Sequence, residues 1–398
     1  MKVIPFYLPQ FHTFPENDNW WGKGFTEWTN TKKAVPLFKG HYQPHIPYNN
    51  YYYDLLNIDT MRKQIDIAKT YGVYGFCFYH YWFKNGKRLM EKPIEMFLSH
   101  PELDIKFCLS WANEHWTRAW DGGDKEIIME QEYGGKDEWA NHYNYLKNFF
   151  LDRRYIYINN KPLLIIYRPE LIKDLNEMID CWRKLAKSDG FNGLYIIAQG
   201  TFYCRNISER EHNKSIDGYI MYEPGYTYEA LGVKHGFTSL IKSFITYTKF
   251  FLDYFLIKVK LKICHILNIT PQKPINICKY SELCDAILKH KMYDDYFPGF
   301  FTGWDNTARR GVKARIVTNS SPELFKNYLI KLLKKNALSN YRKEYLFITA
   351  WNEWAEGAHL EPDEKYGYGY LEALKDALAE TGEFPIYSDN VRQNTKKD

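Results

Sequence analysis

The stretch YLFITAWNEWAEG, residues 345–357, joins the pattern of a buried strand to a closely spaced acidic pair. Its first five residues are aliphatic, aromatic or β-branched, which is typical of a parallel strand that is buried on both faces. Glu353 and Glu356 follow among tryptophans, and the stretch contains no Lys or Arg. Because (β/α)8 barrels carry their active sites at the C-terminal ends of the strands, we interpret this stretch as a barrel strand that ends in a carboxylate pair.

Seven other apolar runs precede this strand and alternate with helical patterns, such as a helix over 321–337 with Ser321 as its N-cap and Pro322 in its first turn. The eight predicted strands are 2–8, 73–82, 105–113, 161–169, 193–200, 215–224, 296–306 and 344–354. This alternation predicts an α/β fold, a (β/α)8 TIM barrel. The alternative is a doubly wound sheet with a nucleotide site, but the sequence after the first strand, YLPQFHTFPENDNW, offers no glycine-rich turn.

One catalytic domain is predicted over residues 1–385, with an extended first βα loop, a helical insertion at 226–295 and a polar tail at 386–398. Within the insertion, 237–269 is strongly apolar but carries charged residues throughout, which argues against a membrane-spanning helix. Its apolar positions fall on one helical face. Two interpretations fit this pattern, a lid that packs on the barrel and an interfacial helix that rests on an anionic membrane.

Composition narrows the class of function. The chain has 398 residues, 45% of them hydrophobic, and a formal net charge of only +5 with dispersed basic residues. No nucleic-acid partner is therefore predicted. Aromatic residues are abundant, with 34 Tyr, 25 Phe and 12 Trp. Such rings either fill a large core or stack on the C–H faces of sugars, and composition alone leaves both possibilities open.

Cysteine usage and the N-terminus bear on the cellular compartment. The seven cysteines show no framework spacing and no CxxC pair, and Cys77 and Cys108 lie in strand-like runs that predict buried thiols. The first residues, MKVIPFYLPQFH, contain no apolar signal-peptide core. We therefore expect a reducing, cytoplasmic location, with peripheral contact at the inner membrane if 237–269 binds lipid.

A carboxylate pair suits the cleavage of a glycosidic bond, in which one group protonates the leaving oxygen and the other acts as base or nucleophile. We expect Glu353 and Glu356 to face the cleft about 5–9 Å apart, the span of such pairs. If either side chain pointed into the helix layer or were locked in a pair with an arginine, the assigned catalytic roles would be wrong. The alternative is that one carboxylate is a structural acceptor and the other is solvated.

Further candidates are aromatic and polar residues at the strand ends or in the loops that follow them. Each could contact sugar hydroxyls or rings, and each could equally be a structural residue. They are Tyr7, His12, Trp28, His80, Tyr81, Trp111, Asn113, Glu114, Trp120, Asp121, Tyr167, Gln199, Glu223, Trp304, Asp305, Trp351, Asn352 and Trp354.

The sequence lacks the motifs of several other chemistries. No HExxH or Cys/His quartet is present, and Pro44 disfavours the helix that would align His41 with His45, so neither a metal nor a cofactor is predicted. The chain lacks a P-loop and the GxSxG of serine hydrolases. It also lacks the Asp-x-Asp of one large class of metal-dependent glycosyltransferases.

Several long motifs, in order along the chain, resemble the WbsX-like proteins of bacterial polysaccharide gene clusters, which are related to barrels of the glycoside hydrolase family 99 type. The motifs are IPFYLPQFH (4–12), NWWGKGFTEW (19–28), YGFCFYHYWF (74–83), LSWANEHWTRAWDG (109–122) and AWNEWAEGAHLEPDEKYGYGYL (350–371). The insertion carries none of them.

The resemblance implies roles for the acidic pair. In retaining endo-α-mannosidases of family 99, the first glutamate of a NEWxEG stretch deprotonates the sugar 2-hydroxyl, which attacks C1 to give a 1,2-anhydro sugar. The second protonates the leaving group and then activates water. Carried over, Glu353 is the base and Glu356 the acid/base. Ala355 stands where family 99 usually has His, which argues against carrying over the mannoside specificity.

Three hypotheses follow for the activity. The first is a hydrolase-type enzyme on an oligo- or polysaccharide, lipid-linked or free, in O-antigen, capsule or lipopolysaccharide assembly or trimming. The second is a glycosyltransferase or transglycosylase on the same barrel, in which a hydroxyl replaces water as the acceptor. The third is a non-catalytic glycan-binding protein that keeps the aromatic site.

Overall fold

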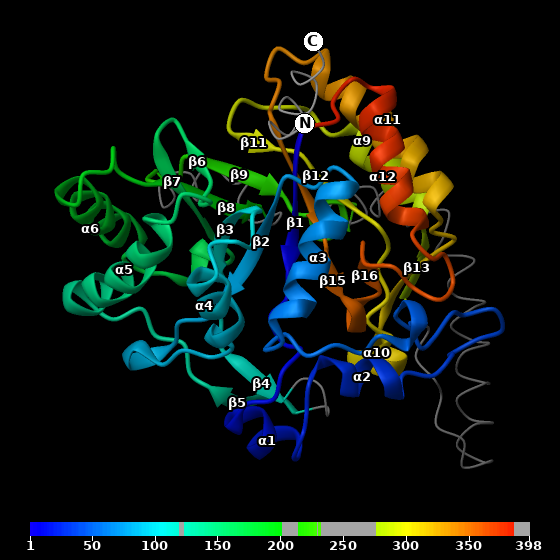
Figure 1. Cartoon of the computed structure of the whole chain (residues 1–398), viewed down its shortest axis with the longest axis horizontal. Helices are drawn as coiled ribbons and strands as arrows, with labels where there is room; N and C mark the ends of the chain where they lie inside the picture. Colours follow the sequence, from blue (N-terminus) through cyan, green and yellow to red (C-terminus); the bar gives the residue numbers. More distant parts are fainter. Residues whose placement is uncertain (119–122, 201–213, 229, 232–275, 386–398) are drawn as a thin grey trace, which may run out of the picture.

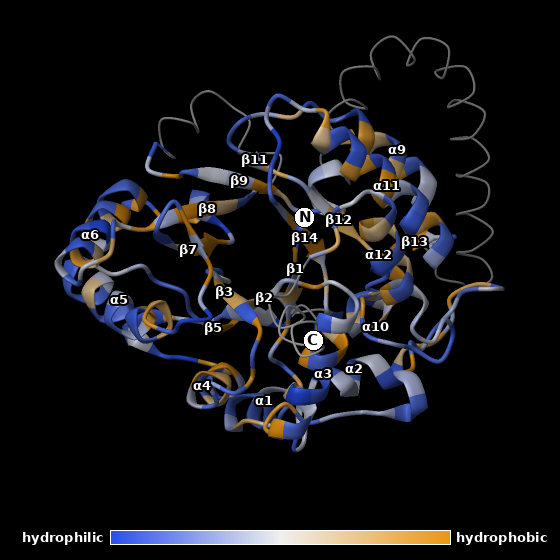
Figure 2. Ribbon diagram, turned by 45° about the horizontal axis from the view of Figure 1, so that its top comes forward, coloured by the Kyte–Doolittle hydropathy of each residue, from blue (hydrophilic) through white to orange (hydrophobic). Residues whose placement is uncertain are grey.

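A nearly closed barrel of nine short parallel strands, with helices packed around it, forms the body of the molecule (Figures 1 and 2). The computed structural model describes residues 1–118, 123–200, 214–228, 230–231 and 276–385. The strands follow the order β11-β9-β8-β7-β3-β2-β1-β14-β12. They are β1 (Lys2–Tyr7), β2 (Gly75–His80), β3 (Lys106–Trp111), β7 (Lys161–Ile166), β8 (Tyr195–Gly200), β9 (Gly218–Met221), β11 (Tyr296–Phe297), β12 (Gly299–Phe301) and β14 (Tyr345–Thr349).

The barrel closes through a single run of chain that Pro298 divides into two strands. β11 pairs with β9 on one side, and β12 pairs with β14 on the other. Proline cannot donate a ladder hydrogen bond, but its carbonyl accepts one of 3.1 Å from Phe347. Gly299 is required here, because a Cβ at this position would lie 1.8 Å from the carbonyl oxygen of Met221. If β11 and β12 are counted as one position, the predicted eight-strand α/β barrel is confirmed.

Side-chain alternation along each strand separates the barrel interior from the helix layer. On β1, Phe6 packs against Phe347 and Tyr222, with ring centroids 6.0 and 5.1 Å apart, and so faces the interior. The next residue, Tyr7, points outward and donates a 2.6 Å hydrogen bond to Gln64 of α3. This parity decides which residues at the strand ends can reach the mouth of the barrel.

The helices cover the outside of the barrel, and the predicted cap of the 321–337 helix is confirmed by a 3.2 Å hydrogen bond from Leu324 N to Ser321 Oγ. The helices are α1 (Pro15–Trp21), α2 (Glu27–Lys33), α3 (Ile58–Thr70), α4 (Glu91–Ser99), α5 (Lys136–Phe150), α6 (Leu175–Ser188), α9 (Tyr280–Lys289), α10 (Thr307–Arg310), α11 (Pro322–Ala337) and α12 (Gly369–Glu380). In Figure 1, α2 and α10 lie beside the end of the barrel toward which β1 and β2 point.

Short strands outside the barrel form its loops. β4 (Trp116–Arg118) pairs antiparallel with β5 (Gly123–Met129), and β15 (Asn352–Glu353) with β16 (Ala358–His359). β10 (Asn276–Lys279) pairs in parallel with β13 (Arg315–Thr318), and β6 (Tyr157–Ile158) adds to the edge of β7.

The predicted insertion at 226–295 is described only in part. Its last segment forms β10 and α9, and α9 precedes the closing strand of the barrel. Residues 237–269 and the predicted tail lie outside the described residues, so the lid and the membrane interpretations both remain predictions. Within the described ranges, none of the helices combines the length and the apolar composition needed to cross a membrane. Cys77 and Cys108 are buried free thiols, as predicted.

Candidate active site

The acidic pair lies on a tight hairpin that follows β14. Asn352 and Glu353 pair antiparallel with β16, and the 3-10 turn Trp354–Glu356 connects the two strands. Gly357 ends this turn with φ 58°, a left-handed conformation that glycine adopts without a Cβ penalty. The hairpin therefore sets both carboxylates on one rigid turn at the C-terminal end of a barrel strand.

Two buried polar contacts fix the hairpin to the barrel. The Asn352 side chain accepts from Leu8 N at 2.7 Å and donates to Leu8 O at 3.0 Å. Beneath the turn, the Glu361 carboxylate accepts hydrogen bonds from Trp354, Tyr53 and Gln64 at 2.6–2.7 Å. Burial nevertheless raises the pKa of Glu361 to about 7, although these donors favour the charged form.

Arg309 of α10 binds both members of the acidic pair and a third glutamate. Its Nη1 lies 2.6 Å from Glu356 Oε1, and its Nη2 lies 3.1 Å from Glu353 Oε2. Its Nε donates to Glu27 Oε1, the first residue of α2, at 2.9 Å. Because one guanidinium spans the pair, the bonded oxygens of Glu353 and Glu356 are separated by about 8 Å at most.

Three carboxylates around one guanidinium leave the cluster with excess negative charge in a buried setting. Burial raises the pKa of Glu353 to about 8; Arg309 opposes this shift, and Glu356 and Glu27 add to it. Burial also raises the pKa of Glu27 against the effect of Arg309. Burial disfavours the charge of Arg309, but the three carboxylates outweigh it and hold its pKa well above the ordinary value. The cluster therefore retains a proton at neutral pH.

The expectation that no arginine holds the pair is wrong. Glu353 and Glu356 lie 44 and 47 residues from Arg309 in sequence, so a search of the local segment could not find the partner. The fold brings them together because α10 follows β12, and β12 is the barrel neighbour of β14. The interaction does not remove proton-transfer chemistry, because Arg309 binds one oxygen of each carboxylate and the cluster still carries excess negative charge.

Four tyrosines stand near this cluster at the mouth of the barrel. The hydroxyls of Tyr79 and Tyr222 lie 3.0 Å apart. Burial and then the charge of Glu353 raise the pKa of Tyr81 and Tyr222, which places both phenols close to the pair. Burial likewise raises the pKa of Tyr167, with a smaller effect from Glu356. These phenols remain neutral hydrogen-bonding groups at physiological pH.

Three predicted site residues point into the helix layer and not into the mouth. Tyr7 bonds to α3, as described above. His80 contacts His142 of α5 at 2.9 Å, and burial lowers the pKa of His80 to about 3. Trp111 donates to Trp82 O at 3.1 Å and packs edge-on against His142. The expectation that these three residues line the site is wrong, because each occupies a strand position whose side chain points away from the barrel interior.

Other predicted residues have structural partners. Asn113 bonds to the backbone of Arg168, and Glu114 pairs with the side chain of Arg168 at 3.0 Å. Glu223 accepts from Thr227 N and Oγ1 at 3.1 and 2.8 Å. Asp305 accepts from His41 and Gln43 at 2.6 and 2.7 Å, and so anchors the loop that carries them.

The remaining predicted residues divide between core and loop positions. Trp28 and Trp354 pack on each other with centroids 5.4 Å apart, and Trp351 is fully buried. His12 bonds to Pro9 O, and Gln199 accepts from Ser110 inside the barrel at 3.0 Å. Trp304 lines a cavity behind the hairpin. Trp120 and Asp121 lie outside the described residues.

Sequence reasoning missed Arg309, Glu27, Tyr79 and Tyr222. Arg309 lies in NTARRG, directly after the predicted seventh strand, and Glu27 lies in the quoted GFTEW motif. Tyr79 and Tyr222 each come directly before a predicted residue, His80 and Glu223 respectively. The place of Arg309 after a strand and that of Glu27 in a quoted motif are weak signals, and the strand parity that selects Tyr79 and Tyr222 cannot be read from strands that are apolar on both faces.

Comparison with known proteins agrees with this architecture. The family model described as "Glycosyltransferase WbsX" matches residues 3–374. A curated relative, the uncharacterized protein WxcX of Xanthomonas campestris pv. campestris, is 33% identical over 382 residues. That alignment covers 94% of this chain and 49% of the relative, so the chain spans about half the length of the curated relatives it matches.

Two solved structures share the fold. The GH99 endo-alpha-mannosidase from Bacteroides thetaiotaomicron aligns with a TM-score of 0.51 at 13% identity, over 96% of this chain and 97% of that chain. A structure titled glycoside hydrolase-like protein aligns with a TM-score of 0.52 at 14% identity, over 97% and 94%. At these identities the likeness concerns the fold.

The fold and the acidic cluster define a (β/α)8 barrel with a carboxylate site at its C-terminal face. The chain belongs to the WbsX glycosyltransferase family, whose model covers nearly its whole length. The predicted family resemblance is thereby confirmed.

The charges of Arg309 and its three glutamates predict how a substitution of the arginine changes stability. Arg309→Met removes the cation and leaves two buried carboxylates, Glu27 and Glu353, beside the half-buried Glu356, so the free energy of unfolding should fall by about 3–5 kcal/mol at pH 8. The loss should be smaller at pH 5, because the carboxylates take up protons as the pH falls and their repulsion is relieved. Urea unfolding followed by circular dichroism at both pH values measures this difference.

The control for this variant is Lys313→Met, which changes an exposed cation four residues along the chain and should alter stability by no more than about 0.5 kcal/mol. A loss for Arg309→Met that is equal at pH 5 and pH 8 would contradict the charge balance described here.

Proposed function

We propose that this chain makes or breaks a glycosidic bond of a bacterial oligo- or polysaccharide, with Glu353 and Glu356 as its reacting carboxylates. The observation that carries the proposal is the cluster itself. Two carboxylates stand on one anchored turn at the C-terminal mouth of the barrel, share Arg309 and lie near tyrosines. Membership of a family described as a glycosyltransferase supports the same substrate class.

In the proposed reaction, Glu353 takes the proton of the sugar 2-hydroxyl while O2 attacks C1. Glu356 gives its proton to the leaving glycosidic oxygen, so the C1–O bond breaks and a 1,2-anhydro sugar forms. An incoming hydroxyl then loses its proton to Glu356 and attacks C1. The C1–O2 bond breaks, and Glu353 returns the first proton to O2. Both carboxyl groups end in their starting protonation states.

The raised pKa of Glu353 fits the role of base. A carboxylate with a pKa of about 8 is a stronger base than an ordinary glutamate, and a pKa near the working pH is favourable for proton transfer. The same value means that most molecules carry a proton on Glu353 at pH 7. The enzyme should therefore react through its deprotonated fraction, in which Arg309 stabilises the Glu353 anion.

Sugar contacts are proposed for the phenols near the cluster. Tyr79, Tyr81, Tyr167 and Tyr222 offer neutral hydroxyls and ring faces, which suit sugar hydroxyls and C–H faces. Glu114 and Arg168 lie further along the same rim as a surface pair that could bind an extended chain. Composition left open whether the abundant aromatic residues fill the core or stack on sugars, and sugar binding is proposed for these four tyrosines.

Hydrolysis and transfer differ only in the group that attacks C1 of the activated sugar. Water gives hydrolysis, and a sugar hydroxyl gives transfer if water is excluded. The family description favours transfer as the second candidate. We place the reaction in the assembly or trimming of a surface polysaccharide in the cytoplasm, on a substrate that is free or lipid-linked at the inner membrane.

The catalytic roles of Glu353 and Glu356 can be tested by measuring the turnover of oligosaccharides from the bacterium in which this protein occurs. Glu353→Gln and Glu356→Gln should each lower turnover by at least about 10²-fold, as expected for lost acid–base catalysis. An activated aryl leaving group needs little protonation, so Glu356→Gln should be largely rescued on such a substrate and Glu353→Gln should not. Release of reducing sugar separates hydrolysis from transfer.

A matched control is Glu364→Gln, an exposed glutamate after the hairpin, which should keep full turnover. A substrate without the 2-hydroxyl should fail even with the unaltered protein. Cleavage of this 2-deoxy substrate at a normal rate would exclude the anhydro-sugar route. If Glu356→Gln lost only glycan binding in a chain that shows no turnover, the chain would be a glycan-binding protein.

The pH dependence of kcat/KM assigns the role of Glu353. A base acts in its deprotonated form, so the loss of the Glu353 proton should give the pH profile a limb on which the rate rises with pH through about 8. This limb should vanish in Glu353→Gln. A rate that instead falls as the pH rises through 8 would make Glu353 the proton donor and reverse the two roles.

A further inference from the structure

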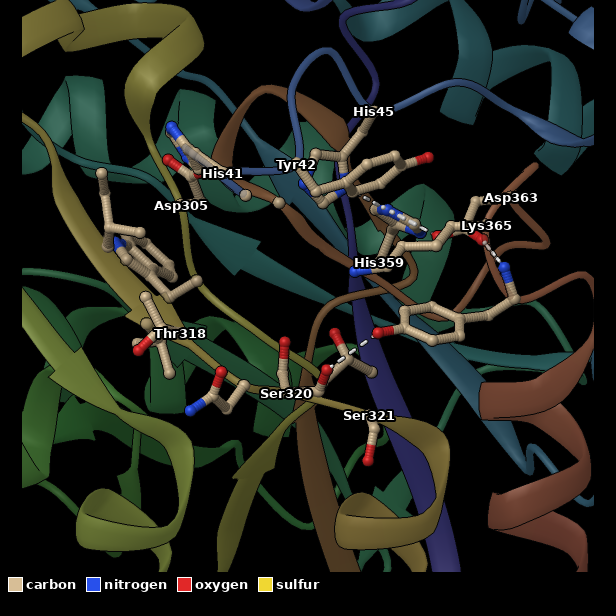
Figure 3. A pocket seen from close by; sticks show the side chains of 18 of the residues that line it. His41, Tyr42, His45, Asp305, Thr318, Ser320, Ser321, His359, Asp363 and Lys365 are labelled. Carbon is tan, nitrogen blue, oxygen red and sulfur yellow. Dashed lines mark hydrogen bonds and ion pairs between the residues drawn. The ribbon is translucent and has the colours of Figure 1, made fainter. Parts of the chain in front are cut away.

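Behind the hairpin lies a second cluster of side chains that the proposed reaction does not use. His45 Nδ1 lies 3.0 Å from His359 Nε2, and His359 Nε2 lies 3.8 Å from Asp363 Oδ2. The three ligand atoms all lie within 4.8 Å of one another. Figure 3 shows these side chains converging at one side of a cavity of about 480 Å³, with His41 and Asp305 apart from them.

The hydrogen bonds around the cluster orient it as a set of ligands. His359 Nδ1 lies 3.1 Å from the carbonyl oxygen of Glu361, which can only accept, so Nδ1 carries the proton and Nε2 offers a lone pair. A backbone carbonyl on the second nitrogen is the usual outer contact of a metal-bound histidine. Asp363 is held in the same way, because its Oδ1 accepts from Tyr366 N at 2.6 Å.

The backbone presets the distance between the two segments that bear the ligands. Tyr48 N donates to Pro362 O at 3.0 Å, and Glu364 N donates to Ile46 O at 2.9 Å. His45 and Asp363 therefore stand beside paired stretches of chain. Ligand atoms about 2.0 Å from a tetrahedral ion lie about 3.3 Å apart, close to the 3.0 and 3.8 Å found here. The ligand atoms of His45 and Asp363 lie within 4.8 Å of each other, so an ion would draw these two side chains together. It would also take the place of the His45 Nδ1 proton, which is now donated to His359 Nε2, and His45 would then carry its proton on Nε2.

We propose that His45, His359 and Asp363 form a binding site for a divalent transition metal ion of the zinc type. Two imidazole nitrogens and one carboxylate oxygen suit zinc and its neighbours, whereas magnesium and calcium prefer all-oxygen sites. The adjoining cavity leaves room for water as the remaining ligand. No metal was predicted from local motifs, because His45 and His359 are 314 residues apart in the sequence.

The metal would connect the loop around His45 to the chain that follows the catalytic hairpin. The same loop carries His41 and Gln43, which bind Asp305, and Asp305 N donates to Glu356 O at 2.6 Å. The ring of His359 is also stacked on Trp354 at 3.9 Å. The ion would thus stabilise the scaffold behind Glu356 without touching the reacting groups.

The test uses the full chain after removal of metals with EDTA. Zinc chloride titrated into it by calorimetry should bind at one equivalent and raise the Tm. Cobalt chloride should give the visible absorption of a low-coordinate Co²⁺ site. His45→Ala and Asp363→Asn should each weaken zinc binding at least about tenfold and abolish this absorption.

His100→Ala is the matched control, because His100 is a surface histidine beside an acidic residue, Glu102, and its loss should leave binding unchanged. Circular dichroism in EDTA checks that each variant is folded. The site is disproved if wild-type protein binds zinc with a Kd above about 0.1 mM. It is equally disproved if folded His45→Ala and Asp363→Asn bind zinc as tightly as the wild type.

Discussion

The guanidinium of Arg309 is the contact on which the arrangement of the mouth depends. It joins α2 through Glu27, α10 on which it stands, and the hairpin that carries Glu353 and Glu356. Bringing several carboxylates out of water is costly unless a cation and hydrogen bonds compensate. One cation cannot balance three anions, so the cluster keeps a proton, and its protonation state becomes a property that substrate binding can change.

Much of the fold could be predicted from the sequence. The eight strand positions come from apolar runs that are long enough for a strand and too short for a helix, separated by helical periodicity. The helix at 321–337 carried its own start signal in Ser321 and Pro322. The sequence shows Pro298 within the predicted seventh strand but does not show that the strand divides there. Proline is tolerated at the point where the chain changes its partner strand from β9 to β14.

The site was predicted less completely, for physical reasons. Strands of a parallel barrel are apolar on both faces, so the sequence does not reveal which parity faces inward. Tyr7 and Phe6 illustrate this: the predicted residue faces α3, and its neighbour faces the interior. Arg309 and the His45–His359 pair lay beyond any local pattern, since only the closed barrel brings their partners near.

The central claim is that the Arg309 cluster holds a proton on Glu353 at neutral pH, and infrared spectroscopy of the carboxyl groups tests it without a substrate. The protein should show the C=O stretch of a protonated carboxyl that persists at pH 7 and disappears as the pH rises through about 8. Glu361, whose pKa is about 7, gives a second band in both proteins, so the band to follow is the one that titrates through about 8. This band should be absent from the difference between pH 7 and pH 9 in Glu353→Gln. If no protonated carboxyl remains above about pH 6, or if the band survives in Glu353→Gln, the account of the cluster is contradicted.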